Sequence, residues 1–206
     1  MRECIKFASI AVAVASCAAS AGVLGNASFE EDIFGDFPPA SGSWVSFSAD
    51  GDQFMGGDVA FSSAAMARTG ARSMELGITV ANSFAGAFQD VGGLSAGDAW
   101  TFGGWHKSLG VAGGTEIRIE WRDSVNDVEI SRTPNLAPTV GSDWEEFMLT
   151  DFVPVGADSA RIVYAIQSFG AGIDQSVFVD DVYFVPAPGA LALLGLGGLT
   201  ATRRRR

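Results

Sequence analysis

The middle of the chain alternates between apolar and polar residues. In residues 72–80, Met74, Leu76, Ile78 and Val80 fall on one side of an extended chain, and small or polar residues fall on the other. A period of two is typical of a β-strand with one buried face. No interior stretch carries a helical apolar stripe over three turns. We therefore predict strands at 44–48, 72–80, 83–91, 99–107, 117–121, 147–149, 162–166 and 176–184.

Glycine and proline clusters, such as Gly92-Gly93 and residues 134–138, separate these segments as turns. About eight or nine short strands in one domain are typical of an all-β, two-sheet antiparallel β-sandwich of the jelly-roll type. The pattern predicts this fold for residues 22–185. It predicts a short apolar helix at each end of the chain.

Residues 1–21 are typical of a secretory signal peptide. Arg2 and Lys6 precede an apolar stretch over residues 7–19, and the small residues 19–21 offer a cleavage site. Two alternatives remain open: a buried N-terminal helix, or a lipoprotein signal in which Cys17 is lipidated. Because both cysteines lie in this segment, ordinary cleavage leaves a mature protein without a thiol.

Residues 186–206 form a second distinct segment. A proline-rich stretch precedes an apolar run at 190–199, and four arginines end the chain. This arrangement resembles the PEP-CTERM sorting tail of Gram-negative bacteria, although Ala187 stands where glutamate is usual. The resemblance implies a transient membrane anchor, cleavage by an exosortase-type peptidase and a place at the cell surface or in the extracellular matrix. A simple C-terminal anchor is the alternative. The sorting residues would be Val185, Pro186, Pro188, Gly189, Arg203, Arg204, Arg205 and Arg206.

The 206 residues include 24 acids and 13 bases, for a net charge of −11. Without the two end segments, residues 22–185 keep 7 bases and 23 acids, a net charge of −16. Nucleic acid is thereby excluded as a partner, because affinity for phosphate backbones comes mainly from clustered lysine and arginine. The carboxylates are suitable ligands for calcium, which prefers oxygen.

Several ordered motifs resemble the galactose-binding-like jelly rolls of carbohydrate-binding modules related to families 4, 9 and 22. They are the opening Asn26-Ala27-Ser28-Phe29-Glu30, a Gly-x-x-Ser strand at 70–74, the turn at 93–100 after Gln89, the strand start Gly104-Trp105-His106-Lys107, and Val179-Asp180-Asp181-Val182 near the end. The resemblance implies a structural calcium ion (Ca²⁺). Its ligands would be the side chains of Glu30 and of Asp181 or Asp180, with carbonyl groups near Ser28, Gly70 and Ser73.

The same resemblance implies a glycan site on one exposed sheet face. Strand alternation places Trp105 outward and Trp100 and Phe102 inward. Trp121 and Trp144 are expected in the core, and the role of His106, the single histidine, is left open. An acidic cluster at 50–58 lacks EF-hand spacing and is interpreted as a solvated loop. The expected glycan-binding residues are Trp105, Gln89, Arg118, Glu120 and Gln167, with Arg161 as a possible extension.

Catalysis has little support in the sequence. It contains no Gly-x-Ser-x-Gly or His-Glu-x-x-His motif, and a catalytic triad would have to use His106. The sequence thus predicts an exported, non-catalytic β-sandwich that binds a glycan or the extracellular polysaccharide matrix. The alternative is a structural or adhesive surface protein that keeps the fold without a sugar site.

Overall fold

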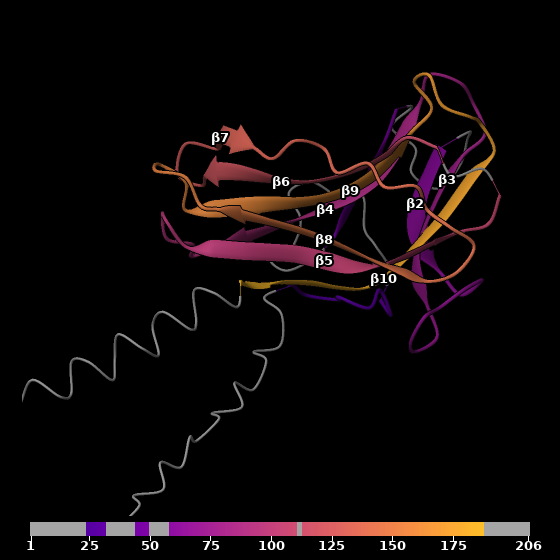
Figure 1. Cartoon of the computed structure of the whole chain (residues 1–206), viewed down its shortest axis with the longest axis horizontal. Coiled ribbons are helices and arrows are strands. Elements are labelled where there is room, and N and C mark those ends of the chain that lie inside the picture. Colours follow the sequence, from indigo (N-terminus) through magenta and orange to yellow (C-terminus); the bar gives the residue numbers. More distant parts are fainter. Residues whose placement is uncertain (1–23, 32–43, 50–57, 111–112, 188–206) are drawn as a thin grey trace, which may run out of the picture.

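A computed structural model describes residues 24–31, 44–49, 58–110 and 113–187. The predicted leader, the acidic loop up to residue 57 and the tail from Pro188 onward lie outside the described residues. In the described part, two antiparallel sheets pack face to face as a sandwich (Figure 1). The predicted all-β, two-sheet antiparallel fold is therefore confirmed.

Each sheet has five strands. Sheet A has the order β1-β4-β9-β6-β7 and sheet B the order β2-β3-β10-β5-β8, so consecutive strands often lie in different layers. The strands of sheet A are β1 (Val45–Ser48), β4 (Phe84–Gly92), β9 (Ser159–Gln167), β6 (Thr115–Asp123) and β7 (Val128–Arg132). Those of sheet B are β2 (Asp58–Ser63), β3 (Ser73–Ile78), β10 (Gln175–Pro186), β5 (Ala99–Ser108) and β8 (Glu145–Phe152).

The core lies between the two sheets and follows the predicted alternation. Met74, Leu76 and Ile78 on β3 are completely buried, as are Ile162, Tyr164 and Ile166 on β9. Because every second side chain of a strand points to the same side, these sets face each other across the sandwich. Large aromatic residues fill the space between them: Trp44, Trp121, Phe29, Phe102 and Phe184.

Two observed strands, β2 and β7, are absent from the predicted set. Both are edge strands. The inward residues of β2 include Ala60 and Ser62, which are small or polar, and β7 is mostly exposed. Neither strand therefore carries the large apolar alternation that a sequence pattern can detect.

The last strand extends beyond the predicted domain boundary. β10 pairs with β5 as far as Pro186 opposite Trp100, and the backbone N–H of Ala187 donates to the carbonyl of Ala99 at 2.8 Å. Val185 and Pro186, which the sequence assigns to the sorting motif, thus also belong to the central strand of sheet B. Within the described residues, no helix has the length and apolar character needed to cross a membrane.

Candidate functional site on the outer face of sheet A

The predicted glycan-binding residues do not share one face. Arg118 and Glu120 lie on β6 and Gln167 on β9, all in sheet A, whereas Trp105 lies on β5 in sheet B. Alternation correctly places Trp105 outward, but it does not tell which of two sheets a strand joins. The expected single face is therefore divided between opposite sides of the sandwich.

Gln89 has a structural position instead of a binding one. Its side chain is buried on the inner face of β4, where Nε2 donates to the Gly25 carbonyl at 3.0 Å and Oε1 accepts from the Gly25 amide at 2.8 Å. The Trp44 indole N–H donates to the same carbonyl at 3.1 Å. Gln89 thereby holds the N-terminal segment on the core and cannot reach a ligand on the outer surface.

Trp105 is half-buried, and one ring face is covered. The guanidinium carbon of Arg68 lies 3.9 Å from the centre of the Trp105 ring. This cation–π contact occupies the surface that a sugar would stack on.

The outer face of sheet A can be built from the strand register, because paired residues on neighbouring strands point to the same side. One row runs from Phe47 through Gly86 and Ala165 to Glu116, and the next contains Phe88, Val163 and Arg118. A third row consists of Asp90, Arg161, Glu120 and Arg132, and Phe84 opposite Gln167 lies at the other end. The face is aromatic near β1 and β4, and polar near β6 and β7.

Four phenylalanines form a continuous strip along the aromatic side. The ring centres of Phe88 and Phe47 are 6.2 Å apart, those of Phe47 and Phe84 6.1 Å, and those of Phe84 and Phe169 6.4 Å. Phe84 is 36% exposed and Phe169 53% exposed. This surface, which we call the phenylalanine strip, leaves ring surface available at its Phe84–Phe169 end.

A hollow lies between the phenylalanine strip and the polar residues. Its volume of about 230 Å³ equals that of roughly eight water molecules. The floor of the hollow includes the small side chain of Ala165. A Cβ on Gly86 would lie 2.5 Å from Cζ of Phe47, so only glycine allows this ring to lie across β4. The hollow is lined by Phe47, Phe84, Phe169, Glu116, Arg118, Ala165, Ile166 and Gln167.

The polar side of the hollow consists of paired charges and one amide. Nε of Arg118 is 2.7 Å from Oε1 of Glu120, and its Nη1 is 3.6 Å from Oε2 of Glu116. The buried Oε1 of Gln167 has no hydrogen-bond partner. An acceptor in this state is costly unless a donor reaches it. The Gln167 residue lines the hollow, and this oxygen is enclosed by the protein.

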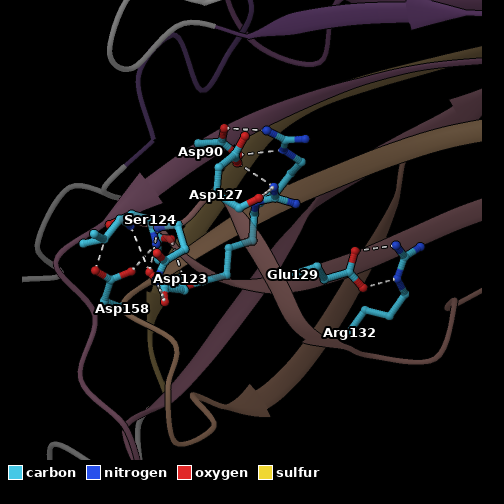
Figure 2. A network of polar contacts seen from close by, with 12 residues as sticks. Asp90, Asp123, Ser124, Asp127, Glu129, Arg132 and Asp158 are labelled. Carbon is cyan, nitrogen blue, oxygen red and sulfur yellow. Dashed lines mark hydrogen bonds and ion pairs between the residues drawn. The ribbon is translucent and has the colours of Figure 1, made fainter.

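Ion pairs continue along the face beyond the hollow. Arg161 makes a two-pronged contact with Asp90 at 2.8 Å and lies 4.0 Å over the Phe88 ring; Asp90 raises the pKa of Arg161. Figure 2 shows Glu129 beside Arg132, and Asp158 facing Ser124 next to Asp123. Hydrogen bonds from Ser124 lower the pKa of Asp158, and that from Arg132 lowers the pKa of Glu129. The pKa of Asp123 is lowered by hydrogen bonds from Asn126. The network fixes the β6–β7 end of the face and keeps its charges paired.

The predicted metal residues meet in a different place, at the loop before β3. Asp180 is completely buried; its carboxylate accepts the backbone N–H groups of Arg68 at 2.7 Å, Thr69 at 3.1 Å and Asp181 at 2.7 Å. Burial raises the pKa of Asp180, and these N–H groups oppose the rise. Glu30 accepts the N–H groups of Ala71 at 3.0 Å and of Arg72 at 3.2 Å.

The remaining predicted ligands also have donors or other roles at this loop. Asp181 accepts from the Arg68 guanidinium at 2.5 Å and from the Thr69 hydroxyl at 2.6 Å. Gly70 lies against Glu30, where a Cβ would overlap the carboxylate. Ser73 donates its hydroxyl to the carbonyl of Met66 at 2.6 Å. The carboxylate oxygens at this loop are bound by N–H and O–H donors. Calcium would instead need six to eight oxygen ligands directed at one point, and this arrangement does not fit that requirement.

His106 is part of the core. Its Nδ1 lies 2.8 Å from the hydroxyl oxygen of the buried Tyr164, and burial lowers its pKa to about 4. Across residues 24–31, 44–49, 58–110 and 113–187, no group of three or more His, Cys, Asp or Glu side chains could hold a metal.

The predicted glycan site does not include the phenylalanines of the strip. The signal was present: in residues 84–91, Ala85, Ala87, Gln89 and Val91 alternate with Phe84, Gly86, Phe88 and Asp90. Which set faces outward depends on whether glutamine or phenylalanine is buried. Composition favours burial of phenylalanine, and the observed hydrogen bonds of Gln89 with Gly25 reverse this preference.

Comparison with known proteins gives structural matches. No family model matches the chain, and no curated protein matches it. The enzymatically active domain of tailspike protein 4 from bacteriophage CBA120 matches with a TM-score of 0.60 at 18% identity, over 81% of this chain but only 21% of the tailspike chain. This chain therefore spans about a fifth of that protein's length.

Three further solved structures match over nearly their whole length. A carbohydrate-binding module of family 4 has a TM-score of 0.53 at 19% identity, covering 80% of this chain and 99% of the module. The xylan-binding CBM22-1 domain of Paenibacillus barcinonensis has a TM-score of 0.53 at 18% identity, covering 82% and 97%. A putative sugar-binding protein of Bacteroides thetaiotaomicron has a TM-score of 0.58 at 9% identity, covering 81% and 100%. At such low identities the similarity shows the fold: this chain is a β-sandwich of the kind found in carbohydrate-binding modules.

Proposed function

We propose that this protein is a non-catalytic module that binds a glycan on the outer face of sheet A. The observation that carries the proposal is the hollow between the phenylalanine strip and the polar side chains of Glu116, Arg118 and Gln167. A sugar ring has an apolar C–H face and hydroxyl groups at its edge. The phenylalanine strip offers a stacking surface to the C–H face, and the polar residues offer hydrogen bonds to the hydroxyl groups.

The roles of the residues follow from their positions. Phe84 and Phe47 would stack against the sugar, and Gly86 leaves room for the Phe47 ring to lie across β4. Gln167, which lines the hollow beside Glu116 and Arg118, would face the hydroxyl groups of the sugar. Of the residues predicted from the sequence, Arg118, Glu120 and Gln167 thus stay in the proposed site, whereas Gln89 and Trp105 do not.

The fold similarity supports this proposal, since the matching solved structures include a xylan-binding domain and a family 61 module in complex with β-1,4-galactotriose. The glycan of this chain is not fixed by that similarity.

We also propose that the protein is exported, and that an exosortase-type peptidase cleaves its tail and sorts it to the cell surface or to a polysaccharide matrix. Support for this comes from the leader and tail in the sequence. The structural calcium ion remains an untested prediction, and glycan binding at sheet A does not require it.

Affinity gel electrophoresis of the purified protein tests the site, with soluble xylan, β-glucan and galactan in separate gels. We expect at least one polysaccharide to retard the protein, and Phe84→Ala and Phe47→Ala to weaken the retardation by roughly tenfold or more in Kd. Phe152→Ala is the matched control, because Phe152 is 65% exposed on β8 of the other sheet. No retardation of the folded protein by any glycan would instead favour a structural or adhesive role. Equal effects of all three substitutions would place the sugar elsewhere.

A further inference from the structure

The three acidic residues at the loop before β3 need positive charge nearby. Asp180 and Asp181 are neighbours in β10, and Glu30 binds the same loop, residues 68–72. Carboxylates brought together in a partly buried place repel each other unless a cation or hydrogen-bond donors lie between them. The fold resemblance assigns this task to calcium.

We infer that the guanidinium of Arg68 performs this task in place of a metal ion, so that the domain is stable without calcium. This inference is independent of the proposed glycan site. Nη1 of Arg68 lies 2.5 Å from Oδ2 of Asp181, and the Thr69 hydroxyl takes the other oxygen at 2.6 Å. Both oxygens of the most exposed aspartate are therefore bound by donors of the chain itself.

The position of Arg68 is fixed at three points. Its backbone N–H donates to Asp180, its guanidinium donates to Asp181, and the same guanidinium stacks 3.9 Å over the Trp105 ring. Arginine suits this place because its planar group can pair with a carboxylate and stack on an aromatic ring simultaneously. The Arg68 side chain, 31% exposed, is thereby held by contacts on its backbone, its charged group and its ring-facing side.

The other carboxylates are satisfied by the same loop. Asp180 accepts three backbone N–H groups and Glu30 accepts two, all with the positive end of the donor directed at an oxygen. Gly70, with φ of +65°, gives the loop the turn that directs these N–H groups and leaves room for Glu30. A calcium ion would compete with these donors for the same carboxylate oxygen atoms.

Thermal melting of the full chain in EDTA and in millimolar calcium tests the inference. We expect the wild-type Tm to be the same in both solutions. Arg68→Met keeps much of the side-chain volume but removes the charge, and we expect it to lower the Tm by roughly 3–8 °C in EDTA. Lys107→Met is the matched control, because Lys107 also lies on the outer face of β5, near Trp105, and has no acidic partner among the described ion pairs. We expect it to leave the Tm almost unchanged.

A double-mutant cycle separates the charge from general packing. In an Asp181→Asn background, Arg68→Met should lower the Tm by less than half as much as it does alone, since no unpaired carboxylate remains. A rise of several degrees in the wild-type Tm with calcium would overturn the inference. The inference would also be overturned if Arg68→Met had the same Tm as Lys107→Met. The same holds if Arg68→Met lowered the Tm equally in the wild type and in the Asp181→Asn background. If Arg68→Met does not fold, the calcium arm on the wild type and on Asp181→Asn still decides. None of these outcomes depends on glycan binding.

Discussion

At the scale of single residues, the buried pair of His106 and Tyr164 makes stability depend on pH. Burial lowers the pKa of His106 from 6.5 to about 4, so the folded state holds this histidine neutral where the unfolded state takes up a proton. Between these two pKa values the unfolded state binds more protons, and the free energy of unfolding falls as the pH falls. At pH 4.5 the loss from this group alone should be about 2–3 kcal/mol relative to pH 7.

Urea denaturation at pH 7 and at pH 4.5, for the wild type and for His106→Gln, measures this loss. The variant is expected to be less stable at pH 7, because Tyr164 loses its partner. Its further decline on acidification should be smaller than that of the wild type, since it lacks the titrating group. Carboxylates titrate in both proteins and cancel in the comparison. Parallel declines in the two proteins would show that His106 is not the group responsible.

At the scale of elements, strand β4 contains two glycines with opposite expected tolerance of a methyl group. A Cβ on Gly86 would lie 2.5 Å from Cζ of Phe47 and 2.8 Å from the Tyr164 carbonyl oxygen, whereas a Cβ on Gly92 meets no heavy atom within 4 Å. Gly86→Ala should therefore lower the free energy of unfolding by about 1–3 kcal/mol. It should also weaken glycan binding, because Phe47 must move.

Gly92→Ala is the control for this pair and should change the free energy of unfolding by less than about 0.5 kcal/mol. Urea denaturation measures the free energy of unfolding of both variants, and affinity electrophoresis measures their Kd for the glycan. A Gly86→Ala variant as stable as Gly92→Ala would mean that Phe47 can turn away from β4 without loss. The phenylalanine strip would then not be a fixed surface.

The elements also show how far the sequence alone leads. Alternation predicts the strands with one large apolar face, such as β3 and β9, and it identifies Trp105 as outward-facing. It fails for the edge strands β2 and β7, whose inward residues are small or whose side chains are exposed. It also cannot reveal the sheet order, and this is why Arg118 and Trp105 are found on opposite faces. Pairing between distant strands depends on tertiary packing, to which local periodicity gives no access.

At the scale of the whole molecule, the distribution of charge limits the kind of glycan that can bind. Residues 22–185 contain 7 bases against 23 acids, so the domain as a whole repels polyanions. Four of these bases, Arg118, Arg122, Arg132 and Arg161, lie on the strands of sheet A, and each is paired with an acidic side chain. An acidic polysaccharide would have to break these pairs, whereas a neutral glycan would leave them intact.

We therefore expect binding to depend on stacking and hydrogen bonds and to be almost independent of salt. Raising sodium chloride from about 50 mM to about 500 mM shortens the Debye length several-fold and screens attraction between a cationic site and an anionic chain. The Kd for a neutral polysaccharide, measured by affinity electrophoresis, should change by less than about twofold over this range. A uronic-acid polysaccharide at low salt is the control and should retard the protein least. Strong binding of that polymer, lost at high salt, would show that the arginines of sheet A leave their carboxylate partners to bind the ligand, and the neutral-glycan assignment would be wrong.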